Sequence, residues 1–310
     1  MLTDPDLLET YRYDRATFCE AGHPLAVVRA RSTVQVSAVM RIATEHRVPV
    51  VPQGARSGRS GAANAIDGCI VVSVEAMSEV LHVDVRNRYV VTEPGIFNAD
   101  PSRIVGEHGL FYPPDPSSRE FSSIGGSLAT DCGGLRCVMY GVTSDYVMGL
   151  EVVLADGEVL RTGRRTVKGV TGYDLTRLFV GSEGTLGIIT EATLSLQPAA
   201  ALPETVAATF ADAHDAALGV AAVIGGQAVP SLLEFMDRTS VHAVNDSFRL
   251  GFGDEVRPGS RAIRRAGRTG CQGGGRGAGG PARRGRVPST WSAPPTRQRV
   301  PCSWPRAGRC

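Results

Sequence analysis

Residues 48–61 read VPVVPQGARSGRSG, a short apolar strand that runs directly into a loop with three glycines and two serines. Glycine permits positive φ angles and close backbone approach, so the N–H groups of such a loop can converge on an anion. The loop is not a P-loop, because no Gly-Lys-Ser/Thr follows, and it lacks the fingerprint G-x-G-x-x-G. Alone, it predicts either an anion-binding loop or a simple glycine-rich turn.

Two more loops of small residues follow along the chain. Residues 113–141 read PPDPSSREFSSIGGSLATDCGGLRCVMYG, and residues 181–189, GSEGTLGII, form a turn that leads into a strand. Structural turns alone rarely need so many close backbone approaches. The three loops together therefore predict one long ligand that lies between layers of the fold.

The sequence around these loops alternates readable strands and helices. Apolar residues recur at helical spacing over 34–46, with Ser32 and Thr33 as available caps. Asp156–Gly157 predicts a hairpin turn. The remaining predicted elements are strands over 48–52, 69–74, 185–196, 205–210 and 231–236, two strands around a turn at 86–87, and helices over 101–108 and 213–224. This order indicates an α+β chain rather than a regular doubly wound sheet.

Composition places the chain among ordinary globular proteins of up to two domains. It has 310 residues, of which 42% are hydrophobic and 21% charged, and no apolar run approaches the length of a bilayer span. The N-terminus, MLTDPDLLET, carries acids where a secretory signal peptide carries basic residues. We expect a cytoplasmic protein without a transmembrane segment, with a peripheral place at the inner membrane as the alternative.

The charge is divided unevenly along the chain. Residues 257–310 contain 13 Arg and no Asp or Glu, which leaves 20 basic and 31 acidic residues in positions 1–256, a net of −11. Three interpretations fit this tail: an RGG-like nucleic-acid segment, although no Phe or Tyr is interleaved, a disordered tail, or a frameshift. We favour the frameshift. A single lysine against 32 arginines indicates a GC-rich gene, and out-of-frame translation of GC-rich codons yields mainly Arg, Gly, Pro and Ala, as in this tail. Nucleic-acid binding is not expected, and translating the other two reading frames tests the frameshift.

The linked motifs carry a family resemblance. PQGARSG, PPDPSS, SSIGG, CGGLRCVMYG, TVKGVTGYDL and GSEGTLGIITEATLSLQP occur in the order that resembles the FAD-binding domain of the vanillyl-alcohol oxidase/p-cresol methylhydroxylase (PCMH) flavoproteins. Within that superfamily the sequence is similar to bacterial glycolate oxidase FAD subunits and D-lactate dehydrogenases, over roughly residues 10–255. The resemblance implies an α+β fold: a PCMH-type FAD-binding domain of two α/β subdomains in 1–200, the start of an incomplete ferredoxin-like cap in 201–256, and the tail in 257–310.

The resemblance also implies which residues bind the cofactor. Residues 53–58 would hold the FAD diphosphate, and residues 115 and 123–126 match a segment along the cofactor. Residues 134 and 141 match the glycines of the following turn, and residues 183–189 would meet the ribityl chain and flavin ring. These residues are Gln53, Gly54, Ala55, Arg56, Ser57, Gly58, Asp115, Ser123, Ile124, Gly125, Gly126, Gly134, Gly141, Glu183, Gly184, Gly187 and Ile189. No histidine occurs in 53–61, so non-covalent FAD is expected. Asp131 stands where many relatives carry Asn and is not counted as a contact.

The resemblance further implies an FAD-dependent oxidoreductase of small 2-hydroxy acids such as D-lactate or glycolate, with a quinone, a cytochrome or oxygen as electron acceptor. Relatives take their base and carboxylate ligands largely from the cap and the segment after it. No His, Lys, Asp or Glu follows residue 256, so no catalytic residue is assigned. The alternative is a catalytically dead fragment that at most binds FAD. An NADPH-dependent sugar-nucleotide reductase is a third reading, and PPDPSS and GSEGTLGII argue against it.

Single residues add little to this assignment. The six histidines are scattered and show no metal-ligand spacing, so no metal site is expected. Cys132 and Cys137 are interpreted as reduced packing residues. Lys168, the only lysine, is either a group near the flavin or an acidic substrate, or a surface ion-pair partner.

Overall fold

The computed structural model describes residues 1–16, 18–166, 168–199, 208, 210, 212–226 and 229–248. The chain divides into two units, Met1–Thr269 and Gly270–Cys310, and all described residues belong to the first. The predicted break near residue 257, the tail over 257–310 and most of the predicted strand over 205–210 lie outside the described residues.

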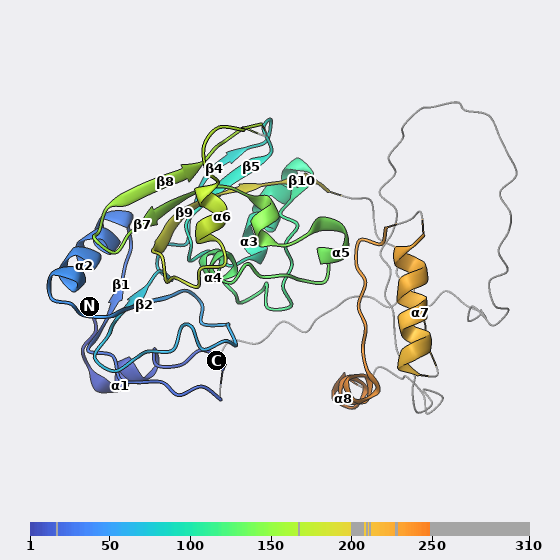
Figure 1. The fold of residues 1–310 in the computed structure, drawn as a ribbon, viewed down its shortest axis with the longest axis horizontal. Helices are drawn as coiled ribbons and strands as arrows, with labels where there is room; N and C mark the ends of the chain where they lie inside the picture. The colour runs from blue at the N-terminus through green and yellow to red at the C-terminus, as the bar shows by residue number, and fades with distance from the viewer. Residues whose placement is uncertain are drawn as a thin grey trace, which may run out of the picture. The chain divides into compact units, whose positions relative to one another are not determined.

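The N-terminal part of the fold contains a three-stranded parallel sheet (Figure 1). Strands β1 (Ala26–Arg29), β2 (Val50–Gln53) and β3 (Ile70–Ser73) pair in the order β1-β3-β2. Helix α2 (Thr33–Glu45) connects β1 to β2, and its N-cap Ser32 accepts a hydrogen bond from the N–H of Gln35. The predicted helix over 34–46 and the predicted strands over 48–52 and 69–74 are confirmed.

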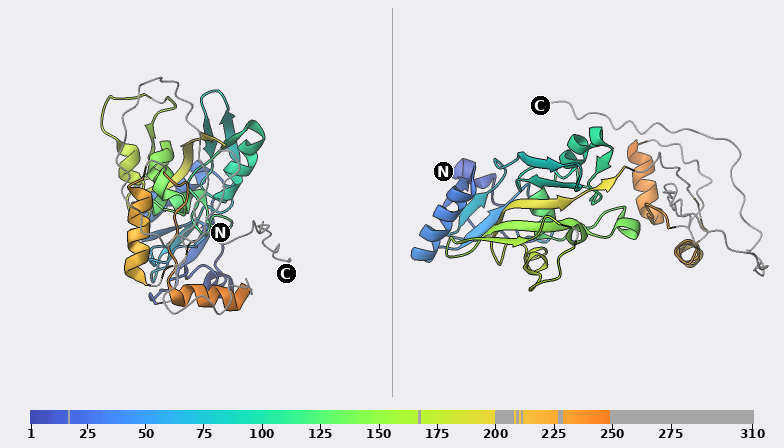
Figure 2. Two further views of the ribbon diagram at one scale, coloured as in Figure 1. Left: turned by 90° about the vertical axis from the view of Figure 1, so that its right-hand side faces the viewer. Right: turned by 90° about the horizontal axis from the view of Figure 1, so that it is seen from above.

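A five-stranded antiparallel sheet follows, in the order β4-β5-β9-β7-β8. Figure 2 shows β9 in yellow, between the cyan β5 and the green β7. The hairpin predicted around Asp156–Gly157 joins β7 to β8, where Val153 pairs with Val159. The strands are β4 (Val80–Asp84), β5 (Tyr89–Thr92), β7 (Val147–Val153), β8 (Val159–Gly163) and β9 (Ile188–Ser195).

Short helices pack on the five-stranded sheet and share its core. Val90 and Leu150 of the sheet belong to one buried cluster with Val105, Leu128 and Phe179 of the helices. These helices are α3 (Ala99–Val105), α4 (Ile124–Ala129) and α6 (Leu175–Phe179). The other elements are α1 (Pro5–Glu9), the 3-10 turns 106–108 and 143–146, β6 (Leu110–Phe111) paired with β10 (Gln197–Pro198), α5 (Cys137–Tyr140), α7 (Ala213–Ile224) and α8 (Arg238–Phe248).

Two local predictions are corrected. Residues 113–141 were expected to form a loop, but they contain α4 and α5. Two adjacent glycines lower the local helix propensity, which is why a loop was expected. In α4, however, the packing against Pro94 leaves no room for a larger residue at position 125, because a Cβ on Gly125 would lie 2.7 Å from Cβ of Pro94. Residues 231–236 were expected to form a strand; the described residues there show a β-bridge at Phe235 and no longer strand. Helix α7 matches its prediction.

A buried carboxylate joins α2 to the five-stranded sheet. Glu151 in β7 is 6% exposed. Its Oε1 accepts hydrogen bonds from the hydroxyls of Thr33 (2.6 Å) and Thr190 (3.1 Å), and its Oε2 accepts from Nε and Nη2 of Arg161 (2.9 and 2.6 Å). Burial by itself would raise the pKa of Glu151, but the hydrogen bonds from Thr33, Arg161 and Thr190 outweigh it and lower the pKa.

Within the described residues, no helix is both long enough and apolar enough to cross a bilayer.

Replacing Glu151 with Gln should destabilise the fold. A glutamine cannot accept both the Arg161 and the threonine hydrogen bonds as a carboxylate does, so we expect the free energy of unfolding to fall by about 2 kcal/mol in urea denaturation at pH 7. The lowered pKa means that the stabilisation is present above the pKa of the unfolded glutamate, about 4.3, and is lost as the pH falls through the folded pKa.

The parent chain should therefore lose stability on acidification below about pH 4.3 more steeply than Glu151→Gln. The exposed Glu158, seven residues along on the same hairpin, serves as the control. If Glu158→Gln lowers the stability as much as Glu151→Gln does, the network has no special role.

Candidate functional site

A cavity of about 560 Å³ opens where the parallel sheet meets α4 and the start of β9. Ligands in open parallel sheets bind at the carboxyl ends of the strands, and Gln53 at the end of β2 lies on the wall of this cavity. The three loops singled out in the sequence all contribute to the lining. The predicted residues on the wall are Gln53, Gly54, Ala55, Arg56, Ser57, Gly58, Gly125, Gly126, Glu183, Gly184, Gly187 and Ile189.

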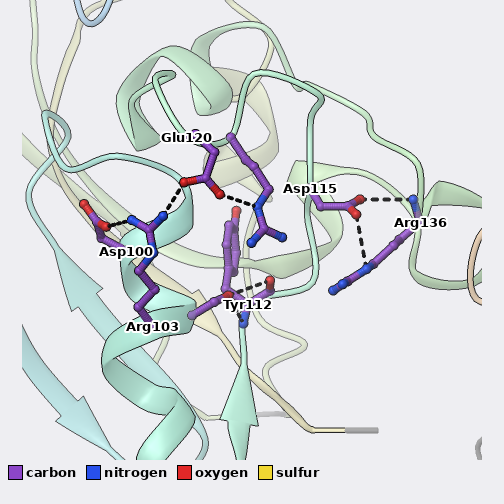
Figure 3. A network of polar contacts seen from close by, with 8 residues as sticks. Asp100, Arg103, Tyr112, Asp115, Glu120 and Arg136 are labelled. Carbon is purple, nitrogen blue, oxygen red and sulfur yellow. Dashed lines mark hydrogen bonds and ion pairs between the residues drawn. The ribbon is translucent and has the colours of Figure 1, made fainter. Parts of the chain in front are cut away.

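Five predicted residues lie outside this lining: Asp115, Ser123, Ile124, Gly134 and Gly141. Ile124 is fully buried in the core beneath α4. Figure 3 shows Asp115 turned toward Arg136, whose N–H and Nε contact its carboxylate at 3.0 and 3.1 Å. Burial raises the pKa of Asp115 in spite of the neighbouring Arg136. Asp115 thus fixes the loop around Gly134 and Arg136 rather than facing the cavity.

The segment around Asp115 is held by a second group of charges. Arg103 in α3 bridges Asp100 and Glu120, and Glu120 also contacts Arg119. In Figure 3 these ion pairs lie beside the backbone segment that leads from Tyr112 through Asp115 to Glu120. It anchors one end of the segment that supplies Ser118 and Ser122 to the cavity wall.

The hydroxyl of Ser123 joins the first loop to α4. Its Oγ accepts hydrogen bonds from the N–H groups of Ala55 (3.1 Å) and Gly126 (3.3 Å). A Cβ on Gly54 would lie 2.3 Å from this oxygen, so only glycine allows the approach. Gly184 is similar, because it has φ of 77° and its added Cβ would lie 2.4 Å from Cγ of Pro52. The glycines therefore bring three chain segments into contact around the cavity.

The segment 10–16, here called the N-terminal strap, holds the first loop from outside. Nothing in its sequence, TYRYDRA, points to this role. Asp14 also lies on the cavity wall. Four hydrogen bonds of 2.7–3.0 Å join Thr10 to Arg56, Tyr11 to Gln53, Asp14 to Gly61 and Arg15 to Gly58.

The charges on the cavity wall do not favour an anion. Asp14, Asp131 and Glu183 stand against Arg56 and Arg59. The guanidinium of Arg56 is used elsewhere, since it lies 3.2 Å from Glu75 and 4.4 Å over the ring of Tyr11. Arg59 is the one cation on the wall for which the described residues show no ion pair, so an anion in this cavity would rely mainly on backbone N–H groups.

Two acidic side chains on the wall have left-handed backbone, Asp131 with φ of 46° and Glu183 with φ of 49°. Residues other than glycine in this region are uncommon, and they concentrate at functional sites. The carboxylate of Asp131 accepts from the N–H (2.7 Å) and hydroxyl (3.0 Å) of Ser144. Both of its oxygens are thus bound within the fold, which reduces any repulsion of an anionic ligand.

Unpartnered polar atoms show what the cavity would bind. Gln53 Oε1 and Ser122 Oγ are buried and have no hydrogen-bond partner, and both residues lie on the wall. In the described part of the chain, the N–H groups of Arg56, Ser57 and Gly58 also have no acceptor. Unsatisfied buried polar atoms are costly, so this set fits a large polar ligand with acceptors for the loop and hydrogen-bonding groups for Gln53 and Ser122.

The cysteines and the lysine considered in the sequence are not among these unpartnered groups. Cys132 lies on the cavity wall as a free thiol, and Cys137 accepts a hydrogen bond from the N–H of Gly134. Lys168 is exposed on the loop after β8, outside the lining. Among the described residues, no group of three or more His, Cys, Asp or Glu could hold a metal ion. The sequence prediction missed Asp14, Ser118, Ser122 and Asp131 as wall residues, since their position depends on contacts distant in sequence.

Comparison with known proteins shows what the fold resembles. Residues 24–163 match the FAD binding domain family. The chain is 44% identical over 241 residues to glycolate oxidase subunit GlcD of Bacillus subtilis, covering 78% of this chain and 51% of that protein. It is 36% identical over 241 residues to D-lactate dehydrogenase of Anaerostipes hadrus, covering 78% and 50%. The chain therefore spans about half the length of these relatives.

Among solved structures, alkyldihydroxyacetonephosphate synthase shares the fold. It superposes with a TM-score of 0.73 at 21% identity, covering 86% of this chain and 53% of that one. This likeness supports the expected α+β fold with a PCMH-type arrangement of two α/β subdomains. Of the range 201–256, the structure describes 208, 210, 212–226 and 229–248, which include α7 and α8. The incomplete ferredoxin-like cap expected there stays a prediction.

Gly125→Ala should destabilise the protein, because the new Cβ would lie 2.7 Å from Cβ and 3.0 Å from O of Pro94. We expect the free energy of unfolding to fall by about 1–3 kcal/mol in urea denaturation. Gly106→Ala is the control, because its added Cβ meets nothing within 4 Å and its φ is −59°. Equal losses for the two variants would mean that the close approach of α4 to Pro94 is not required.

Proposed function

We propose that this chain is a PCMH-type FAD-binding oxidoreductase, that it binds FAD non-covalently and that it oxidises small 2-hydroxy acids such as D-lactate or glycolate. The observation that carries the proposal is the cavity whose wall joins free loop N–H groups to the unpartnered oxygens of Gln53 and Ser122. The names of the relatives, glycolate oxidase and D-lactate dehydrogenase, support the substrate class.

In this proposal the first loop binds the diphosphate. The N–H groups of Arg56, Ser57 and Gly58 are the available donors, whereas the N–H of Ala55 is already bound to Ser123. Gly54 contributes by letting the loop approach Ser123, and the N-terminal strap fixes the loop so that its donors keep one orientation. Preorganised N–H groups bind an anion without paying for reorganisation.

The other predicted residues divide by position. Gly125, Gly126, Glu183, Gly184, Gly187 and Ile189 lie on the wall, where they would meet the rest of the cofactor. Ser123, Ile124, Asp115, Gly134 and Gly141 would act behind the wall by fixing its segments. A bound flavin would supply the acceptor for the hydride that leaves the substrate α-carbon.

For substrate binding, we propose a domain of the chain but no individual residue. We propose that residues 1–200 form the FAD-binding domain and that residues 201–256 begin the cap, which would supply the base and the cationic carboxylate ligands. No residue of this chain is assigned as the base. The electron acceptor would be a quinone, a cytochrome or oxygen.

A second candidate function is FAD binding without turnover. The observation that favours it is that the described wall of the cavity offers groups that would hold a cofactor, while no residue on it is assigned as a base. The two candidates agree on the cofactor and differ only in whether a hydroxy acid is oxidised.

The purified 310-residue chain should carry FAD in near-stoichiometric amount, seen as flavin absorbance and as FAD released on denaturation. Reduction of an artificial electron acceptor with D-lactate or glycolate would then support the oxidoreductase, with L-lactate and buffer as controls. FAD without turnover would select the second candidate. A colourless protein that does not take up added FAD would contradict both.

Ser122→Ala should weaken FAD binding while leaving the fold intact, because Ser122 Oγ has no partner within the protein. Loss of one hydrogen bond, about 1.4 kcal/mol, corresponds to a tenfold higher Kd. Titration of the apoprotein with FAD, followed by flavin fluorescence, measures this change. Ser117→Ala is the control, since Ser117 is exposed and lies outside the cavity lining; an unchanged Kd for Ser122→Ala would remove Ser122 from the site.

A further inference from the structure

One charged side chain on the wall of the cavity has no partner among the described residues. The wall carries five charged side chains, those of Asp14, Arg56, Arg59, Asp131 and Glu183. Contacts within the fold engage four of them. In the part of the chain that the structure describes, the side chain of Arg59 forms neither a hydrogen bond nor an ion pair, so it is available to a ligand.

Two of the acids on the wall are directed at donors of the fold. Oδ1 of Asp14 accepts from the N–H of Ala16 at 2.6 Å, and Oδ2 accepts from the N–H of Gly61 at 3.0 Å. Oε2 of Glu183 accepts from the hydroxyl of Ser60 at 3.3 Å, which joins the third glycine-rich loop to the first. An anion in the cavity would therefore meet carboxylates that already share their charge with the protein.

Arg59 combines a fixed backbone with a free side chain. It lies between Gly58, whose carbonyl accepts from the N–H of Arg15 at 2.9 Å, and Gly61, whose N–H is bound to Asp14. The N-terminal strap thus holds the loop on both sides of Arg59, while Arg59 itself is exposed on the wall. The strap therefore positions this cation without using it.

Free backbone donors lie directly before Arg59 in the same loop. The N–H groups of Arg56, Ser57 and Gly58 have no acceptor in the described part of the chain. A guanidinium beside such donors suits a phosphate, because its planar fork can donate two parallel hydrogen bonds to phosphate oxygens. The diphosphate is the charged part of FAD at neutral pH, so it is the part of the cofactor that fits this arrangement.

We propose that Arg59 binds the diphosphate of FAD and that its charge makes the cavity select FAD over riboflavin. The inference rests on the proposed function. The wall has three acids against two arginines, so replacing Arg59 by a neutral residue changes the formal charge of the wall from −1 to −2. The backbone donors carry no net charge, and Arg59 adds a single positive charge to them.

The carboxylate of a hydroxy-acid substrate is the competing anion for Arg59. A carboxylate offers only two oxygens, whereas a diphosphate offers enough oxygens for the guanidinium and the three N–H groups together. Because Arg59 and these N–H groups belong to one loop, a single ligand group can use all of them. The diphosphate therefore fits better than the carboxylate.

The test is titration of the apoprotein with FAD and, separately, with riboflavin, followed by flavin fluorescence. Arg59→Gln should raise the Kd of FAD about tenfold, because a hydrogen bond to a charged group is lost, and should leave the Kd of riboflavin unchanged. ADP, which carries the diphosphate without the flavin, should displace FAD from the parent and should bind about tenfold more weakly to the variant. Arg59→Lys should recover part of the affinity for FAD.

Arg86→Gln is the matched control, because Arg86 is exposed, lies outside the lining of this cavity and forms no ion pair among the described residues. Thermal unfolding of the Arg59→Gln apoprotein should match that of the parent, since the side chain has no partner in the described part of the chain. The 13 arginines of positions 257–310 are the same in every variant, so any phosphate binding by them is a constant background.

An unchanged Kd of FAD for Arg59→Gln, or an equal rise in the Kd of riboflavin, would overturn the inference and leave the proposed function intact. A parent chain that binds no FAD would overturn both. If Arg59→Gln kept the Kd of FAD but weakened the change that glycolate causes in the flavin absorbance, Arg59 would bind the substrate carboxylate instead, and the inference would be wrong.

Discussion

The fold depends on how closely the loop after β2 can approach α4. The hydroxyl oxygen of Ser123 accepts hydrogen bonds from the N–H groups of Ala55 and Gly126. It thus connects a loop of the parallel sheet to α4, which packs on the five-stranded sheet. The contact is possible because Gly54 has no Cβ. Ile124, the next residue, is fully buried in the core of the five-stranded sheet, so the position of the loop is coupled to that core. The cavity exists because the loop after β2 and α4 meet at a glycine rather than at a larger side chain.

In the proposed site, an anion would be recognised by dipoles and not by net charge. Three carboxylates lie on its wall, and the guanidinium of Arg56 is engaged by Thr10, Tyr11 and Glu75. The fold limits the effect of one of these carboxylates by directing Asp131 at Ser144. Backbone N–H groups fixed by the N-terminal strap can then serve as donors. A rigid loop is required for this, because free backbone groups would otherwise turn toward water.

The five-stranded sheet separates two surfaces of different character. At the start of β9 lies the glycine-lined cavity, and at its end lies a second cavity of about 990 Å³ whose wall contains five arginines. Between them the buried Glu151 binds Thr33, Thr190 and Arg161 and so ties α2 to the middle of the sheet. Two cavities of different character are thus built on one sheet without sharing residues.

The sequence by itself determined the α+β class, the helix over 34–46, the strands beside it and the three glycine-rich loops. These features are local, because side-chain periodicity, caps and glycine act within a few residues. Only the tertiary structure decided that Gly125 and Gly126 lie in a helix, that Asp115 faces Arg136 instead of the cavity, and that residues 10–16 hold the first loop. Each of these depends on a partner that lies far along the chain, such as Tyr11 for Gln53, 42 residues away. A contact of that kind leaves no periodic pattern in the sequence, because it is created only when the segments pack.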